Sequence, residues 1–229
     1  IMLQPLGLFP DETKQHLDLL LEYVEVYFQM GAEVLPPLSL AEISVRTRIN
    51  RAPGCRQLNA LDILAQLKPR VPADAFCVLA LTREDLYPED SWNYVFGYAS
   101  FRERVGVYSF ARYDPSFFGQ PRPDQFRRLF LRRSLQILAH ETAHMYGLKH
   151  CIYYHCVVNG SNNMAESDAQ PLHLCPVCLR KLHFAIGFDL LQRYDDLHAF
   201  YQRAGLEREA AWIQDRHAWI AGSKNPLAY

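Results

Sequence analysis

The sequence predicts an α/β (α+β) fold in which a half built of strands and helices precedes a helical half rich in metal ligands. Three observations carry this prediction. Short apolar runs of strand length alternate with amphipathic stretches of helix length before residue 147. Four histidines and two cysteines crowd into residues 140–156, and the pattern after residue 178 is helical.

The first elements follow from their apolar spacing. Residues 11–30 carry apolar side chains three to four positions apart, which predicts an amphipathic helix. Residues 32–40 are apolar but contain two adjacent prolines, which limits them to a short or edge strand. Residues 41–49 alternate in places and predict a second strand. The leucine spacing of residues 58–67 predicts a second helix that closes before Pro69.

Three apolar runs predict the main strands. Residues 76–81, FCVLAL, form a continuous apolar run with a β-branched residue, which predicts a strand buried on both faces. Residues 94–100, YVFGYAS, and 105–113, VGVYSFARY, are separated by the polar stretch 101–104. This spacing predicts an antiparallel pair.

A helix that leads into the histidines follows a proline-rich loop at residues 114–123, and Pro123 suits the first turn of that helix. Its apolar stripe runs from Phe126 to Leu138. Its arginines are predicted to form a solvated or salt-bridged face: Arg127, Arg128, Arg132 and Arg133. Residues 179–200 and 205–220 predict two further helices.

Composition narrows the class of protein. With 229 residues and 49% hydrophobic content, the chain can build one core or one domain of two lobes. Its 24 basic and 25 acidic residues give a net charge of −1, which argues against a general nucleic-acid binder. No apolar run reaches the roughly 20 residues of a membrane span. Residues 1–14 lack the cationic start of a secretory signal, so we expect an intracellular protein, cytoplasmic or nuclear.

Two histidines and a glutamate form the first metal-binding motif, HETAH. Residues four apart on a helix share one face, so the imidazoles of His140 and His144 can reach one ion. Glu141 stands one position along, where it can reach a metal-bound water rather than the metal. The short motif alone also occurs by chance in helices whose histidines are ordinary surface or core residues.

The residues after this motif favour a catalytic zinc site. Gly147 can take the left-handed conformation that ends a helix, which lets the chain turn back and bring His150 to the same ion. Three neutral imidazoles leave a fourth position for water, whose pKa zinc lowers towards about 7. Glu141 can accept the proton of this water and pass it to a leaving amine, so it is the predicted catalytic residue. The predicted zinc ligands are His140, His144 and His150.

Four cysteines in two pairs predict a second, structural zinc site. Four thiolates close a zinc tetrahedron and leave no open position. Two alternatives stay open: two local disulfides, or one knuckle completed by His155 or His173. The cysteines are Cys151 and Cys156, then the CPVC knuckle of Cys175 and Cys178.

Metal binding in a reducing compartment explains the cysteines better than disulfides do, because a chain of this size can fold without disulfide bonds. The remaining two, Cys55 and Cys77, stand in apolar surroundings and are predicted to be buried thiols. The tripeptide Asn159-Gly160-Ser161 matches a glycosylation sequon but is more simply a turn.

Together these motifs resemble the archaemetzincin family of zinc metallopeptidases, and its animal branch most closely. HETAHMYGLKH is followed at once by Cys151, then by Cys156 and the CPVC knuckle. WNYVFGYASFRERVGVYSFARY resembles the strand pair before the family's active-site helix, and PLHLCPVCLRKLHFAIGF resembles its second cysteine pair and following helix. The resemblance covers about residues 30–200.

The resemblance implies a metzincin-like zincin fold in one metallopeptidase domain. An upper part, residues 1–147, would hold a mixed twisted sheet and the active-site helix, and a smaller helical part, residues 148–229, would hold the zinc knuckle. It implies two zinc ions, one catalytic and one structural, with Glu141 as general base. An edge strand at residues 94–100 would bind an extended peptide by strand addition. The implied partner is a peptide or protein substrate, without nucleic acid or membrane.

One position departs from the family pattern. Metzincins place a methionine on a tight turn beneath the zinc, which in archaemetzincins commonly lies two residues after the second of these cysteines. Val158 stands at that position, and Met164 follows six residues later. Val158 favours an alternative in which the chain is a catalytically weak or inactive scaffold that binds zinc and peptides. A nucleic-acid-binding zinc finger is a third possibility, which the net charge of −1 disfavours.

Overall fold

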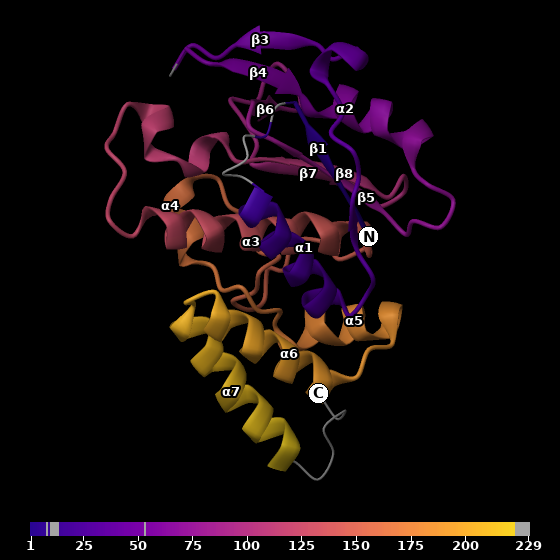
Figure 1. Cartoon of the computed structure of the whole chain (residues 1–229), viewed down its shortest axis with the longest axis vertical. Coiled ribbons are helices and arrows are strands. Elements are labelled where there is room, and N and C mark those ends of the chain that lie inside the picture. Colours follow the sequence, from indigo (N-terminus) through magenta and orange to yellow (C-terminus); the bar gives the residue numbers. More distant parts are fainter. Residues whose placement is uncertain (8, 10–13, 53, 223–229) are drawn as a thin grey trace.

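The structure, a computed structural model, describes residues 1–7, 9, 14–52 and 54–222. Its centre is a five-stranded sheet of β1 (Met2–Leu6), β2 (Glu33–Val34), β5 (Val78–Thr82), β7 (Gly97–Ser100) and β8 (Val105–Ser109). The order is β2-β1-β5-β8-β7, and β7 runs antiparallel to β8 while the other neighbours are parallel. A smaller sheet lies above it (Figure 1) and consists of β3 (Thr47–Ile49), β4 (Arg56–Asn59) and β6 (Asp85–Tyr87).

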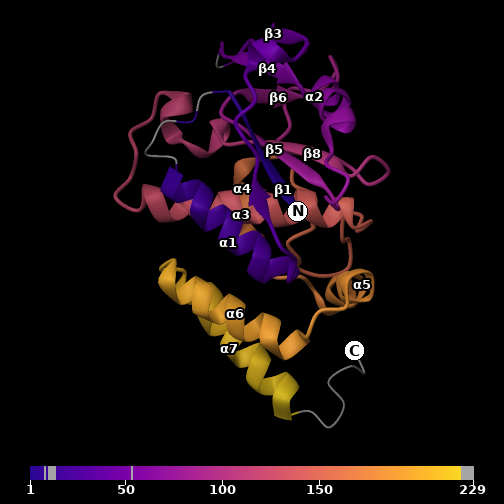
Figure 2. The same ribbon diagram turned by 45° about the vertical axis from the view of Figure 1, so that its right-hand side comes forward.

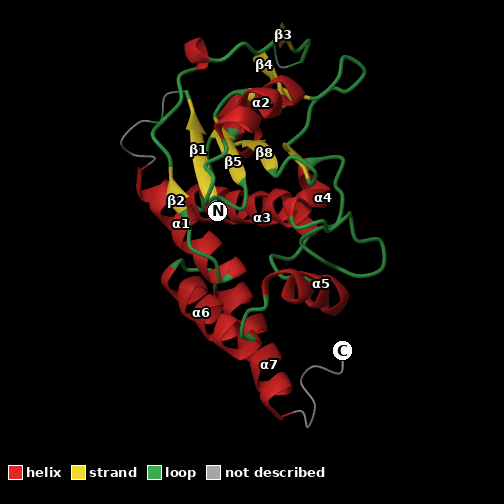
Figure 3. Cartoon of the chain, turned by 90° about the vertical axis from the view of Figure 1, so that its right-hand side faces the viewer, coloured by secondary structure: helices red, strands yellow, loops and turns green. Residues whose placement is uncertain are grey.

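Helices cover both faces of the larger sheet and extend below it (Figure 1 and Figure 3). They are α1 (Lys14–Phe28), α2 (Ala60–Leu67), α3 (Phe126–Met145), α4 (Met164–Ala169), α5 (Pro176–Ile186), α6 (Leu190–Arg203) and α7 (Glu207–Gly222). Short 3-10 helices lie at Leu40–Glu42, Lys68–Arg70, Ala111–Tyr113 and Pro115–Phe118. α2 packs on one face of the sheet and α3 crosses the other, while α5, α6 and α7 form the lower end (Figure 2). The predicted mixed α/β fold is confirmed.

The strand β5 is buried on both faces, as the continuous apolar run at residues 76–81 predicts. Val78 and Ala80 pack in a cluster with α2 on one face of the sheet. Leu79 and Leu81 belong to the larger core on the opposite face, which continues through α1 and α3 into the lower helices. One apolar core therefore connects the sheet to the cysteine-bearing segment.

The predicted antiparallel pair is confirmed as β7 and β8, with Gly97 opposite Tyr108 and Ser100 opposite Val105. Both strands are shorter than the apolar runs. Before Gly97, Val95 forms an isolated bridge with Leu86 of β6, and residues 111–113 turn into a 3-10 helix. Because β7 lies at the end of the strand order, one row of its backbone groups has no strand partner among the described residues.

The strand β1 was not predicted, because Gln4 and Pro5 interrupt its apolar run. Pro5 has no backbone N–H to donate. Its carbonyl accepts the Leu38 N–H at 2.9 Å, so this side of β1 faces an irregular segment rather than a full strand, and the missing donor is tolerated. The Gln4 amide is buried but donates to the Pro36 carbonyl at 2.8 Å. Hydrogen bonds to distant backbone thus allow these residues in a buried strand.

The strands β4 and β6 were also missed, because their buried residues are partly polar. Gln57 and Asp85 are fully buried and hydrogen-bonded to each other at 2.7 Å. The helix predicted at residues 58–67 begins only at Ala60. Asn59 caps it by accepting the Asp62 N–H at 3.0 Å, and the residue before Asn59 belongs to β4.

The N-terminal predictions are otherwise close. The helix predicted at residues 11–30 is α1, although its predicted start lies outside the described residues. The edge strand predicted within residues 32–40 is confirmed as β2. Of the strand predicted at 41–49, only the last three residues form β3. The preceding 3-10 helix has a capping box between Ser39 and Glu42, which ends the extended conformation.

The helical pattern at residues 179–200 was wrongly predicted as one helix. Gly187 interrupts it with φ +83° and ends α5, and the side chain of Asp189 accepts the Gln192 N–H at 2.9 Å to start α6. The prediction at residues 205–220 is confirmed as α7, and α4 was not predicted.

The helix α3 starts at Phe126, three residues after the proline expected in its first turn. Of the four arginines on the predicted face, three form ion pairs among the described residues: Arg128, Arg132 and Arg133. Arg132 pairs with Glu209 of α7 at 2.8 Å, and Arg133 pairs with Asp168 of α4 at 2.6 Å. These pairs hold the histidine-bearing helix against the lower part. Within the described residues, no helix combines the length and apolarity that a membrane crossing requires.

Candidate metal centres

The three predicted histidine ligands converge at the C-terminal end of α3. His140 and His144 stand one helical turn apart, and their Nε2 atoms lie 3.0 Å from each other. The ring of His150 lies 5.2 Å from the ring of His140 and 5.0 Å from that of His144, between centroids. Each of the three histidines offers one ring nitrogen, and these three nitrogens lie within 4.8 Å of one another.

Backbone carbonyls fix the tautomers of the two helical histidines. The Nδ1–H of His140 donates to the Val157 carbonyl at 2.9 Å, and that of His144 donates to the Leu148 carbonyl at 2.5 Å. A carbonyl can only accept, so the proton of each neutral ring stays on Nδ1 and the Nε2 lone pair faces the site.

The site favours neutral imidazoles. Burial, with a smaller contribution from His144, lowers the pKa of His140 to about 3, and burial also lowers the pKa of His144 and of His150. Two Nε2 lone pairs facing each other at 3.0 Å repel unless a cation lies between them. Neutral nitrogen donors in this arrangement fit a zinc ion, which imidazoles bind in their unprotonated form.

The turn that brings in the third histidine depends on Gly147. It has φ +85°, and the backbone N–H groups of Gly147 and Leu148 donate to the carbonyls of His144 and Ala143 at 2.9 and 3.1 Å. This left-handed helix end, as the sequence predicts, reverses the chain towards His150.

Glu141 of α3 is buried beside the histidines and faces β7. It is 4% exposed, and burial raises its pKa to about 8. A Cβ placed on Gly97 of β7 would lie 2.5 Å from its Oε1. The glutamate therefore fits only because a glycine stands opposite.

A cleft of about 480 Å³ opens onto both the histidines and Glu141. One wall is the segment 92–99, which runs into β7, and the opposite wall is the segment 161–170. Tyr94 joins the walls by donating from its hydroxyl to the Asn162 carbonyl at 3.2 Å. Gln136 connects the wall at residues 161–170 to α3, because its side-chain amide donates to the Ser167 carbonyl at 2.8 Å.

Val158 is fully buried at the point where the family pattern expects a methionine. Its neighbour Val157 accepts the hydrogen bond from His140, so this position lies directly next to the histidines. Met164 instead begins α4 and packs against the apolar core. The side chain of Val158 packs in the main apolar core.

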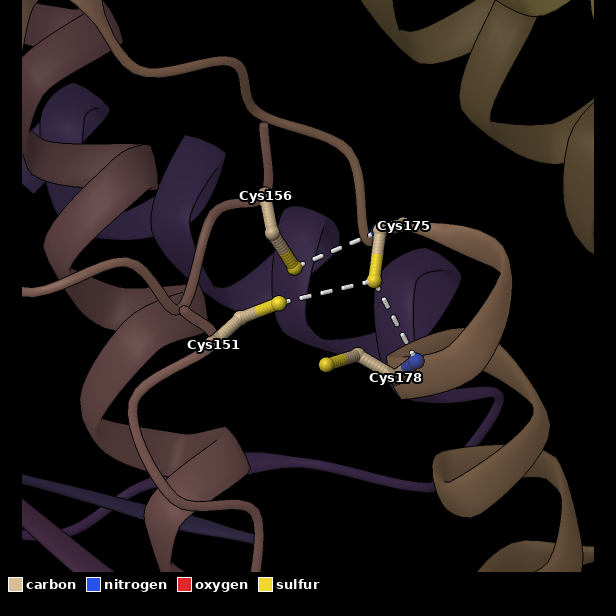
Figure 4. A group of neighbouring side chains, drawn as sticks. All are labelled: Cys151, Cys156, Cys175 and Cys178. Atoms are coloured by element: carbon tan, nitrogen blue, oxygen red, sulfur yellow. Dashed lines mark hydrogen bonds between the residues drawn. The ribbon is translucent and has the colours of Figure 1, made fainter. Parts of the chain in front are cut away.

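The four predicted cysteines form a second cluster (Figure 4), with all Sγ atoms within 4.8 Å of one another. They are Cys151, Cys156, Cys175 and Cys178. The backbone N–H of Cys175 donates to the Cys156 sulfur at 3.2 Å, and that of Cys178 donates to the Cys175 sulfur at 3.4 Å. Hydrogen bonds lower the pKa of Cys156 to about 6, and the largest contribution comes from the side chain of Cys178. Buried sulfurs in this arrangement fit a tetrahedral zinc site.

The two alternatives for these cysteines do not fit the structure. All four cysteines are free, so neither Cys151 and Cys156 nor Cys175 and Cys178 form a disulfide bond. His173 stacks on Trp212 with ring centroids 3.5 Å apart, and neither it nor His155 belongs to the cluster. Both histidines line a separate cavity beside α7.

Asn159 has a structural role that the sequence did not indicate. Its side-chain oxygen accepts the Cys156 N–H at 2.9 Å, and its Nδ2 donates to the carbonyls of Cys151 and Tyr154 at 2.6 and 2.9 Å. The hydrogen-bonded turn runs from Cys156 to Asn159 rather than over the Asn-Gly pair. The asparagine thus braces the loop between the first two cysteines.

The other predicted thiols differ from each other. Cys77 is fully buried, and burial raises its pKa to about 12. Cys55 is only half-buried, in contrast to the prediction, and its Sγ lies 3.7 Å from a carboxylate oxygen of Asp85. Neither belongs to a metal-ligand cluster of the described residues.

The sequence also missed the residues that shape the cleft. Gly97 stands in a predicted strand, where an isolated glycine can mark a close approach of other atoms. Gln136 and the wall from Ser161 to Gln170 carry no comparable signal, because their roles depend on contacts that form only in the fold.

The fold and the two donor clusters define a metzincin-like protein, with a histidine centre in a cleft and a cysteine centre below it. Comparison with known families agrees with this class. A model of peptidase family M54 matches residues 10–184, and the chain belongs to this family, the archaemetzincins.

Relatives and solved structures support the assignment. Archaemetzincin-2 of Macaca fascicularis is 37% identical over 234 residues, which cover 92% of this chain and 62% of that protein. The chain thus spans less than two thirds of that relative. The crystal structure of an archaemetzincin from Archaeoglobus fulgidus, complexed with malonate, is 26% identical with a TM-score of 0.59, over 79% of this chain and 98% of that one. An archaemetzincin from Methanopyrus kandleri is 27% identical with a TM-score of 0.61, over 82% and 96%.

Proposed function

We propose that this chain is a zinc-dependent metallopeptidase that hydrolyses peptide bonds in the cleft between β7 and α3. The observation that carries the proposal is the convergence of three neutral imidazoles beside a buried glutamate at a sheet edge. In this proposal two zinc ions bind. The catalytic ion is held by His140, His144 and His150, and the structural ion by Cys151, Cys156, Cys175 and Cys178.

Glu141 is the proposed general base. Bound zinc would supply a Lewis acid that polarises the peptide carbonyl and acidifies water. Glu141 takes a proton from the attacking water and delivers it to the nitrogen of the leaving amine. Burial raises its pKa to about 8, and the positive charge of a bound zinc ion would favour the ionised form that accepts the proton.

The free edge of β7 is the proposed binding surface for the substrate backbone. Among the residues that the structure describes, Gly97 to Ser100 pair only with β8, so the backbone groups on the other side of β7 can pair with an extended peptide. Such pairing would hold the scissile bond along the cleft, next to Glu141.

The proposed structural zinc supports the third histidine. Cys151 follows His150 directly, and its backbone N–H donates to the Val158 carbonyl at 2.9 Å. A metal held by the four cysteines would fix this loop to the start of α5, which in turn limits the movement of His150.

The proposal is tested by Glu141→Gln. The amide keeps the size of the side chain but cannot accept a proton, so peptide cleavage is expected to fall at least about 1000-fold. Metal analysis should still find two zinc ions per chain. Wild-type cleavage rates in this variant would remove Glu141 from the proposed role.

Val158 favours one alternative, a scaffold that binds zinc and peptides with little or no turnover. A quenched peptide library, assayed with and without a chelator, separates the two functions. A peptidase cleaves peptides in a chelator-sensitive manner, whereas a scaffold retains peptides in a pull-down assay without cleaving them.

A further inference from the structure

We propose that Gly97 is a positioning residue for Glu141, and that the absence of a side chain at this point of β7 sets where the glutamate carboxylate lies. The inference rests on the proposed function for its effect on catalysis. Its effect on packing is independent of that function.

The distances leave no room for any side chain at residue 97. A Cβ on Gly97 would lie 2.5 Å from Oε1 of Glu141, 2.7 Å from its Cδ and 2.8 Å from its Cγ. Rotation of the carboxylate about the Cγ–Cδ bond could relieve only the first contact, because Cδ and Cγ lie on the rotation axis and do not move. The whole glutamate side chain would have to move.

Packing is the main constraint on this carboxylate. Within the described part of the chain, no group donates a hydrogen bond to Glu141. A buried side chain without hydrogen bonds takes its position from the atoms against which it packs. The backbone of Gly97 is therefore the surface against which Glu141 rests on the β7 side.

Backbone conformation does not explain the glycine. Gly97 lies inside a regular strand, paired with Tyr108, and its φ is not in the left-handed region. Glycine in a strand interior is less stable than alanine by about 0.5–1 kcal/mol. The close contact with Glu141 explains why residue 97 is glycine rather than alanine.

The neighbouring strand offers a matched control. A Cβ on Gly106 of β8 would lie 2.9 Å from Cδ1 of Leu79 and 3.2 Å from the Cβ of Ala99, so it is also crowded. It makes no such contact with Glu141. Gly106→Ala therefore reports the effect of a crowded methyl group in the same sheet.

The first experiment is a double-mutant cycle on thermal stability in the presence of a chelator. Gly97→Ala is expected to lower Tm by at least about 3 °C in the wild-type background, because Glu141 is displaced. In the Glu141→Ala background the clash is gone, so Gly97→Ala should leave Tm unchanged or raise it. Gly106→Ala should lower Tm equally in both backgrounds.

Two results of this cycle decide the packing claim. If Gly97→Ala folds only when combined with Glu141→Ala, the claim is supported by the rescue itself. Equal Tm losses from Gly97→Ala in both backgrounds would overturn it, since the obstructing atoms would then belong to another residue.

The second experiment measures peptide cleavage by the zinc-loaded protein. Gly97→Ala is expected to lower kcat about 100-fold with little change in KM, because a displacement of about 1 Å is enough to misplace a catalytic group. Zinc content should stay at the wild-type value, and Gly106→Ala should keep its kcat. An unchanged kcat in Gly97→Ala would overturn the catalytic part. If the wild-type protein cleaves no peptide, the proposed function fails, while the stability cycle still decides the role of Gly97.

Discussion

The histidines of the proposed catalytic centre are neutral, which suits them to bind a cation. The only ring N–H of His140 donates to the Val157 carbonyl, and that of His144 donates to the Leu148 carbonyl. Burial lowers the pKa of both rings, so neither accepts a second proton near neutral pH. The helix therefore presents two unprotonated nitrogens at 3.0 Å before any metal binds. A proton-free donor pair lowers the cost of binding a cation.

A buried ion pair behind the cleft gives a prediction at the same scale. Arg112 binds both carboxylate oxygens of Asp85 at 2.8 Å, and its guanidinium lies 3.6 Å from the ring centre of Tyr94. Arg112→Met leaves the Asp85 charge buried without its cation, so the free energy of unfolding is expected to fall by about 3–5 kcal/mol. Urea denaturation measures this change.

Two variants control this measurement. Adding Asp85→Asn to Arg112→Met removes the stranded charge and should restore part of the stability. Arg46→Met breaks an exposed pair with Asp62 and should cost far less stability, because solvent screens that pair. A loss for Arg112→Met as small as that for Arg46→Met would contradict the prediction.

At the scale of elements, the sequence predicts structure well where apolar spacing carries the information. FCVLAL predicts β5, and the apolar stripe from Phe126 to Leu138 predicts α3, because burial of apolar side chains dominates both. The strands β4 and β6 escape prediction because Gln57 and Asp85 are buried polar residues. Gln57 donates to Asp85, and Arg112 binds the same carboxylate, so their hydrogen bonds join residues far apart in the sequence that no local pattern connects.

The packing of α1 on its neighbours gives a pH-dependent prediction. His16 contacts the rings of Phe110 and Phe130, its Nε2 has no hydrogen-bond partner in the described part of the chain, and burial lowers its pKa to about 4. Between its usual value of 6.5 and about 4, the unfolded chain binds a proton at His16 that the folded chain does not. The free energy of unfolding should therefore decrease as pH falls through this window, by up to about 3 kcal/mol from His16.

The variant His16→Leu isolates this contribution, because every other histidine is still present. Urea denaturation in the presence of a chelator, repeated between pH 7 and pH 4, should show a smaller loss of stability for the variant. Parallel stability profiles for the two proteins would show that His16 does not titrate in this way.

At the scale of the whole molecule, the sequence motifs predict which residues cluster but not the cleft around them. The spacing from His140 to His150 depends on one helix and one left-handed glycine, and both are local. The cleft walls come from segments 92–99 and 161–170, which meet only after the sheet, α3 and α4 have packed. Gly97 shows the limit of sequence reasoning most clearly, because its contact with Glu141 joins positions with no shared pattern.

The two metal centres should differ in their effect on global stability. The cysteine cluster joins the loop after α3 to the start of α5 inside the main core, whereas His150 is exposed at a cleft. Cys178→Ser and His150→Ala should each retain one zinc ion by elemental analysis. Only Cys178→Ser should lower the free energy of unfolding by about 3 kcal/mol or more, because three buried sulfurs lose their metal. His150→Ala should abolish cleavage with a stability change below about 1 kcal/mol. Retention of two zinc ions by Cys178→Ser would show that Cys178 is not a required zinc ligand.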